Sequence, residues 1–118
     1  MNENTLVENT QQSLTNREFE AVISALEQAI DPEMGISVED LGLIYSLQAT
    51  TQDDDRQLRI IMALTMLGCP LSAELQTIVE QAVLANSSFK KVFVQIDPRI
   101  DWDPKRMSRV AKMTLGIL

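Results

Sequence analysis

Apolar positions at the start of the chain follow a helical period. They recur at helical spacing from Phe19 to Ile30. Thr15 and Glu18 have the spacing of a capping box, which predicts that the helix begins beside them. Pro32 disfavours the helical conformation of the residue before it and therefore predicts the end of this helix.

Two strands are then predicted, over Leu43–Thr50 and Gln57–Met66. In the second, Leu58, Ile60, Met62 and Leu64 alternate with other residues on one face. The polar segment Thr51–Arg56, with three consecutive aspartates, separates them as a solvated turn. This short link predicts an antiparallel hairpin. Residues 31–42 precede the hairpin and are expected to form an irregular connector.

The second half of the chain predicts three further elements. A helix is expected from Pro70 to Asn86, followed by a strand over Lys91–Ile96. After a loop over Asp97–Asp103, a last helix is expected from Pro104 to Gly116. The strand–helix–strand order favours a parallel return through a right-handed crossover.

These elements predict an α+β fold with two layers. The expected order is helix, strand, strand, helix, strand, helix, with a small three-stranded mixed sheet covered by three helices. The length of 118 residues suits one domain. We expect residues 1–13 to be a flexible tail and residues 14–118 to form a single domain.

Charge and composition narrow the function classes. The net charge of −7 argues against a nucleic-acid partner, although Lys105, Arg106, Arg109 and Lys112 gather near the end as an expected solvated helix face. No segment is long and apolar enough to span a membrane, and the polar start does not resemble a secretory signal. With a single cysteine as well, we expect a cytoplasmic protein.

That cysteine, Cys69, stands between a predicted strand and a predicted helix. Pro70 is favoured at the first position of a helix, which places Cys69 at the N-cap, where free backbone N–H groups favour a thiolate. Gly68 leaves space beside the sulfur, and Thr65 can aim its hydroxyl into the same region. These residues leave two interpretations open, a functional thiolate or a buried and inert small residue.

Other chemistries have little support in the sequence. The chain has no histidine, no Cys-x-x-Cys motif and no glycine-rich phosphate loop. By themselves, the carboxylate pairs Asp31 with Glu33 and Glu39 with Asp40 indicate loop capping and solvation. Iron–sulfur clusters usually take four thiolates, so one cysteine could bind a cluster only by sharing it across a homodimer or with a partner protein.

Several segments, in this order and spacing, resemble the SufT/PaaD-like family of iron–sulfur assembly proteins, whose eukaryotic relatives serve cytosolic cluster targeting. The segments are Ile30-Asp31-Pro32-Glu33, Val38-Glu39-Asp40-Leu41-Gly42-Leu43-Ile44-Tyr45, Thr65, Gly68-Cys69-Pro70, Trp102-Asp103-Pro104-Lys105-Arg106-Met107-Ser108, Ala111-Lys112 and Leu115-Gly116. The resemblance covers nearly the whole predicted domain.

The resemblance implies a compact α/β fold and a role in maturing iron–sulfur proteins without enzymatic activity. It also implies that Cys69 is the functional, metal-binding residue, with Asp31, Glu33 and Thr65 lining the same pocket. The expected cargo is a labile iron–sulfur cluster or iron. The expected partners are iron–sulfur client proteins and scaffold or carrier proteins, with a homodimer also possible.

Two other functions stay open at this point. The first is an adaptor that binds no metal and docks client proteins near Trp102, which would need that side chain exposed rather than folded over the core. The second is a thiol enzyme such as a one-cysteine peroxidase. It ranks last, because such an enzyme needs a base or cation near the sulfur and the chain has no histidine.

Overall fold

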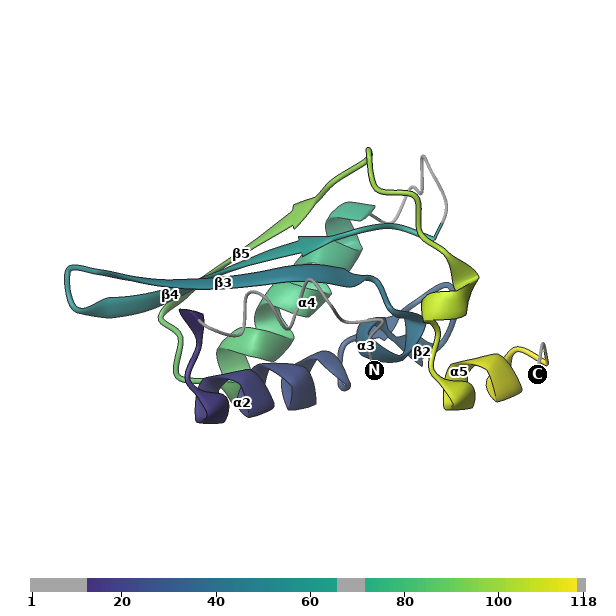
Figure 1. Ribbon diagram of the computed structural model, residues 1–118, viewed down its shortest axis with the longest axis horizontal. Coiled ribbons are helices and arrows are strands. Elements are labelled where there is room, and N and C mark those ends of the chain that lie inside the picture. Colours follow the sequence, from purple (N-terminus) through teal and green to yellow (C-terminus); the bar gives the residue numbers. More distant parts are fainter. Residues whose placement is uncertain (1–12, 66–71, 117–118) are drawn as a thin grey trace.

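The chain folds into a three-stranded sheet with two helices packed on one face (Figure 1). This computed structural model describes residues 13–65 and 72–116. The sheet contains β3 (Ile44–Gln52), β4 (Asp55–Met62) and β5 (Lys91–Ile96), side by side in that order. β3 and β4 are antiparallel, whereas β4 and β5 are parallel and joined through α4 (Ser72–Asn86). The predicted α+β fold with a mixed three-stranded sheet is confirmed.

The hairpin between β3 and β4 is tighter than its sequence suggested. The strands extend to Gln52 and resume at Asp55, so only Asp53 and Asp54 form the turn. Both have positive φ angles, 53° and 69°, as a type I′ turn requires. Aspartate tolerates this conformation better than most residues. At its other end β4 stops at Met62, short of its predicted end.

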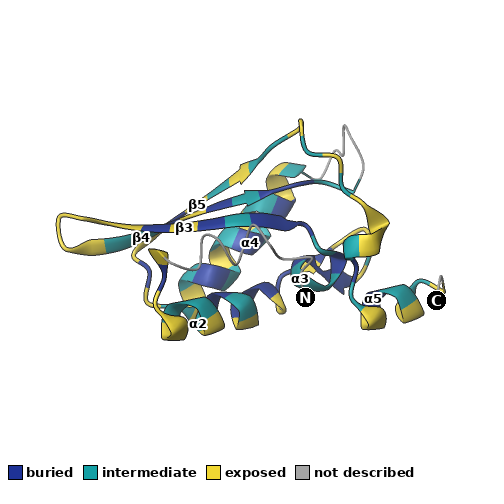
Figure 2. Cartoon of the chain, in the orientation of Figure 1, coloured by how far each residue is buried: buried dark blue, intermediate teal, exposed yellow. Residues whose placement is uncertain are grey.

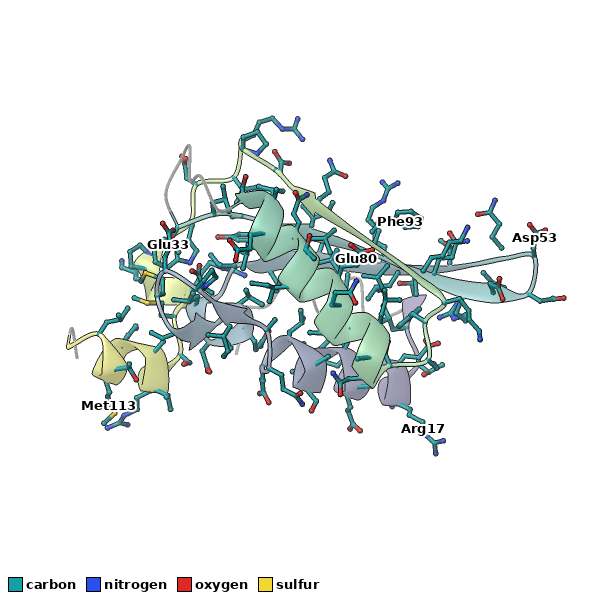
Figure 3. The ribbon with its side chains drawn as sticks, turned by 180° about the vertical axis from the view of Figure 1, so that it is seen from behind. Arg17, Glu33, Asp53, Glu80, Phe93 and Met113 are labelled. Carbon is teal, nitrogen blue, oxygen red and sulfur yellow. The ribbon has the colours of Figure 1, made fainter. Side chains whose placement is uncertain are left out.

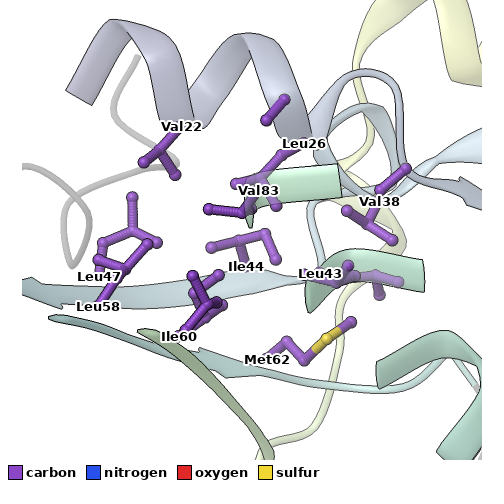
Figure 4. Close-up of a cluster of buried hydrophobic side chains, with 14 of the residues drawn as sticks. Val22, Leu26, Val38, Leu43, Ile44, Leu47, Leu58, Ile60, Met62 and Val83 are labelled. Atoms are coloured by element: carbon purple, nitrogen blue, oxygen red, sulfur yellow. The ribbon is translucent and has the colours of Figure 1, made fainter. Parts of the chain in front are cut away.

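Alternation along the strands gives the sheet one buried face and one open face (Figure 2). Residues on the buried face contact the apolar stripes of the two helices, and several of them are fully buried (Figure 4). The members from the sheet are Leu47, Ala49, Leu58, Ile60, Met62 and Val92, and those from the helices are Val22, Ala25, Leu26, Leu75, Val79 and Val83. The apolar faces predicted for the strands over Gln57–Met66 and Lys91–Ile96 are therefore confirmed.

The first helix, α2 (Asn16–Leu26), begins as predicted but ends earlier. Thr15 accepts a hydrogen bond from the Glu18 backbone N–H, and the Glu18 carboxylate accepts one from the Thr15 backbone N–H. After Leu26 the chain turns into the short strand β1 (Ile30–Asp31). Ile30, expected on the buried stripe of the helix, is instead 44% exposed.

The connector is more regular than predicted. It contains β1, the antiparallel strand β2 (Ile36–Ser37) and one helical turn, α3 (Val38–Leu41). Gly42 ends α3 with a φ angle of 71°. A Cβ atom at this position would lie 2.5 Å from the Arg106 carbonyl oxygen, so only glycine allows the C-terminal segment to approach so closely.

The last helix is divided into two parts. Asp103 caps a 3₁₀ turn, η3 (Pro104–Arg106), as predicted for the start of a helix. Met107 is then extended, and Ser108 caps a second helix, α5 (Arg109–Thr114). The Ser108 backbone N–H donates to the Asp40 carbonyl at 2.7 Å. This bond holds the junction between η3 and α5 against α3. α5 therefore packs on α3 beyond the end of the sheet (Figure 1).

Candidate functional site

Three of the four residues predicted to form the site fall in the described part of the chain. Thr65 is half-buried just beyond the end of β4. Asp31 ends β1 and is 5% exposed, whereas Glu33 is exposed in the turn that follows. Cys69 lies outside the described residues, so its location at a helix N-cap stays a prediction.

A series of backbone hydrogen bonds connects the residues just before Thr65 with the residues just before the Asp31-Pro32-Glu33 turn. Ala63 donates to the Leu43 carbonyl at 2.9 Å, and Leu43 donates to the Val38 carbonyl at 3.1 Å. Val38 donates in turn to the Ala29 carbonyl at 2.9 Å. The two segments therefore meet at the same end of the molecule.

The Asp-Pro-Glu turn lies at the end of the molecule opposite the β3–β4 hairpin. Figure 3 shows this arrangement, with Glu33 and Asp53 labelled near the two ends of the long axis. Because β4 runs away from the hairpin, Thr65 also lies toward the end that carries Glu33. No hydrogen bond joins Thr65 to either carboxylate in the described structure.

The Asp31 carboxylate closes the turn that presents Glu33. Its Oδ1 accepts hydrogen bonds from the backbone N–H groups of Glu33 at 2.8 Å and Met34 at 3.2 Å. The Asp31 carbonyl also accepts a bond from Gly35 at 2.8 Å. A buried carboxylate that satisfies two amides fixes the turn. The expected capping role is therefore correct for Asp31.

In the second carboxylate pair, Asp40 supports the residue that caps α3, Ser37. Ser37 accepts a hydrogen bond from the Asp40 backbone N–H at 3.0 Å and donates its hydroxyl hydrogen to Asp40 Oδ2 at 3.1 Å. Within residues 13–65 and 72–116, no three Asp, Glu, Cys or His side chains gather into a metal-binding group.

Sequence reasoning missed a cluster built around Arg106. The guanidinium lies over the Tyr45 ring, 3.8 Å from its centroid. Its Nε donates to the Gly42 carbonyl at 2.7 Å, and one terminal nitrogen donates to the Ile44 carbonyl at 2.8 Å. The interpretation of Arg106 as part of a solvated helix face is therefore wrong. No local spacing could have indicated these contacts, because the partners lie far apart in the sequence.

The Tyr45 hydroxyl is buried and has no hydrogen-bond partner among the described residues. Burial raises the pKa of Tyr45, and the positive charge of Arg106 offsets this only in part. Trp102 packs over the same region and donates its indole N–H to the Leu41 carbonyl at 2.7 Å. Because this tryptophan is folded back onto the core, it is a poor candidate for an exposed docking anchor.

A cleft of about 340 Å³ lies between the C-terminal end of α2, α3 and the η3–α5 segment. Glu27 and Glu39 line it with negative charge, and Lys105, Arg106 and Arg109 line it with positive charge. The cations near the end of the sequence thus lie beside acidic residues from the first third of the chain.

Comparison with known proteins identifies relatives over most of the chain. Residues 20–96 match the model of the family described as iron–sulfur cluster assembly protein. The chain is 38% identical to the Fe-S protein maturation auxiliary factor YitW of Bacillus subtilis, over 83% of this chain and 93% of that protein. It is 33% identical to the Fe-S protein maturation auxiliary factor SufT of Staphylococcus aureus, over 75% of this chain and 97% of that protein.

Solved structures have the same fold. A domain of unknown function from Bacillus anthracis has a TM-score of 0.72 at 31% identity, covering 84% of this chain and 92% of that one. A conserved hypothetical protein from Thermotoga maritima has a TM-score of 0.68 at 31% identity, covering 88% and 96%. With the family match extending over more than half of its length, this chain belongs to the iron–sulfur cluster assembly protein family.

Proposed function

We propose that this protein is a non-enzymatic auxiliary factor that helps to mature iron–sulfur proteins. The proposal rests on one observation, that this chain is similar to known maturation factors over nearly their whole length. Three relatives described as Fe-S protein maturation auxiliary factors are matched over 93%, 97% and 99% of their own lengths. None of the described helices is long and apolar enough to cross a membrane. A single cysteine suits the reducing cytoplasm, where this proposal places the protein.

In this proposal Cys69 is the residue that binds the cargo, either iron or an iron–sulfur cluster. The chain has only this one thiol, whereas clusters usually take four thiolates. The remaining ligands therefore come from a donor or client protein, or from a second copy of the chain. A site completed by a partner releases its cargo when the partner leaves, which suits transfer better than storage.

The remaining predicted site residues have different parts in this proposal. Thr65 offers a half-buried hydroxyl with no structural hydrogen bond in the described residues, and it precedes Cys69 by four positions. Glu33 offers an exposed carboxylate at the same end of the molecule. Asp31 acts by positioning, because its carboxylate already closes the turn that carries Glu33.

Cellular maturation of iron–sulfur enzymes tests this function. A strain lacking the protein is complemented with the wild type, with Cys69→Ala or with Thr77→Ala, and iron–sulfur enzyme activities are measured. Thr77→Ala is the control, since Thr77 is an exposed residue on α4 whose hydroxyl bonds only within its own helix. We expect Cys69→Ala to lose maturation and the control to retain it. Full maturation by Cys69→Ala would refute the role of the cysteine and favour the metal-free adaptor.

A second experiment tests cargo binding directly. The purified protein is incubated anaerobically with ferrous iron and sulfide, and charge-transfer absorbance is recorded with and without Cys69→Ser. We expect absorbance that depends on Cys69 and that moves to a client apoprotein when the two proteins are mixed and then separated. Equal absorbance in both proteins would show that iron binds elsewhere.

A further inference from the structure

Two large apolar side chains of α5 are exposed. Val110 is 64% exposed and Met113 is 61% exposed. These residues are three positions apart on a helix, so their side chains lie on one face. The opposite face holds Ala111, which is buried against the body of the protein. Figure 3 shows Met113 directed away from the rest of the molecule.

Positive charge surrounds these apolar side chains. Between Pro104 and Gly116 the chain has no carboxylate, although the whole protein has a net charge of −7. Arg106 is held by the Gly42 and Ile44 carbonyls, which leaves the three other cations, Lys105, Arg109 and Lys112. Lys105 and Arg109 are exposed, and neither makes an ion pair with another described residue.

Negative charge lies directly beside this positive surface. Glu27 is exposed at the C-cap of α2 and lines the same cleft as Arg109. It makes no ion pair with a described residue. α2 and α5 lie along the same side of the molecule (Figure 1). We name Glu27, Lys105, Arg109, Val110 and Met113 together the α5 patch.

A surface with adjacent acidic and basic halves is complementary to a copy of itself. In a two-fold dimer the same patch is used by both subunits, so residue i contacts residue j and j contacts i. A two-fold axis near the cleft places the basic half of one copy against the acidic half of the other. The apolar side chains of α5 are then covered in the same contact. We propose that the α5 patch is the interface of a homodimer of this protein.

The patch predicts a weak dimer that depends on salt. A standard interface buries about 800 Å² on each partner, roughly a tenth of the 6905 Å² surface of this chain. One six-residue helix and one helix end provide less than that, so a dissociation constant on the order of micromolar is expected. Exposed opposite charges are screened by salt, so dimerisation should weaken at high ionic strength.

Sedimentation equilibrium over about 1–200 µM protein measures this association. Two variants reverse one charge each, Glu27→Arg and Arg109→Glu. Neither is expected to harm folding, because a cation at a helix C-terminus and an acid at a helix N-terminus both favour the helix dipole. Each lost pair occurs twice in a two-fold interface. The dissociation constant of either variant alone should therefore rise by about tenfold or more.

Mixing the two variants provides the decisive test. In a mixed dimer, position 27 of the Glu27→Arg copy faces position 109 of the Arg109→Glu copy, so opposite charges meet there with their signs exchanged. At the second contact the native Arg109 and the native Glu27 face each other. The mixture should therefore regain association that neither variant has alone. A wild type that stays monomeric over the whole range, or a mixture no better than its components, would overturn the proposal.

Substitutions of exposed apolar residues distinguish this interface from nonspecific hydrophobic association. Met113→Ser in the α5 patch should weaken the dimer, whereas Phe93→Ser should not. Phe93 is similarly exposed, at 52%, but lies on the open face of the sheet far from Met113 (Figure 3). Equal weakening by both would refute an interface at α5. The inference does not depend on iron, so these experiments are read separately from the maturation assays.

Discussion

Replacing Arg106 with alanine should destabilise the protein markedly. The side chain makes two charge-assisted hydrogen bonds to carbonyl groups and lies 3.8 Å above the Tyr45 ring. Hydrogen bonds to charged groups contribute about 1.5–3 kcal/mol each, and a cation over a ring about 0.5–1 kcal/mol. Because water replaces part of the lost bonding, we expect a decrease of about 3 kcal/mol in the free energy of unfolding.

Urea and thermal denaturation followed by Trp102 fluorescence measure this change, since the chain has one tryptophan. A protein of this length has an unfolding entropy of about 0.25 kcal/mol/K, so 3 kcal/mol corresponds to roughly 12 °C in Tm. Arg106→Lys keeps the charge but loses the planar fork that reaches two carbonyls, so it should lose about half as much.

Tyr45→Phe is the matched control for this prediction. It keeps the ring beneath the guanidinium and removes only a buried hydroxyl without a partner among the described residues. The free energy of unfolding should change by less than about 0.5 kcal/mol, in the stabilising direction. If Arg106→Ala cost no more than Tyr45→Phe, the contacts of Arg106 would not stabilise the fold and the reasoning would fail.

Three further predictions concern titration and the Asp-Pro-Glu turn. The hydrogen bond from Arg56 keeps the pKa of Glu18 below its ordinary 4.5 in the folded protein, so its stabilising contribution should be present above about pH 4.5 and disappear as the pH falls through the lowered pKa. Glu18→Gln should remove that part of the acid sensitivity in urea titrations. Ultraviolet difference titration of Tyr45, the only tyrosine, should give a midpoint above 10.0 because the phenol is desolvated, and a midpoint below 10.0 would contradict its burial. Asp31→Ala should lower stability by about 1–2 kcal/mol, whereas Asp31→Asn, which can still accept both amide bonds, should retain stability and maturation activity.

The elements that could be predicted from sequence are those governed by local rules. The capping box at Thr15 follows from residues three apart, and the alternation in Lys91–Ile96 follows from the period of a strand. The parallel return through α4 follows from the handedness and length of crossovers.

The parts that could not be predicted depend on contacts between distant segments. The single helix expected from Pro104 is broken because Ser108 both caps α5 and bonds to the Asp40 carbonyl. Gly42 has the positive φ angle expected of a connector glycine, but its sequence gives no sign that Arg106 packs against it. The arrangement of the candidate site could not be predicted for the same reason. The backbone hydrogen bonds that run from Ala63 to Ala29 join segments that are far apart in the sequence.

The proposed function divides the polar residues of the described structure between two tasks. Asp31 and Arg106 use their charged groups to bind backbone amides and carbonyls, so replacing either should affect stability first and maturation only through it. Thr65 has no such bond in the described residues, and since it follows β4 it lies toward the end of the molecule that carries Glu33. A factor that transfers a labile cargo benefits from this division, because ligands that exchange with a partner cannot also hold the fold. If the proposed function is correct, loss of maturation without loss of stability will therefore identify the cargo-binding residues and separate them from the positioning residues.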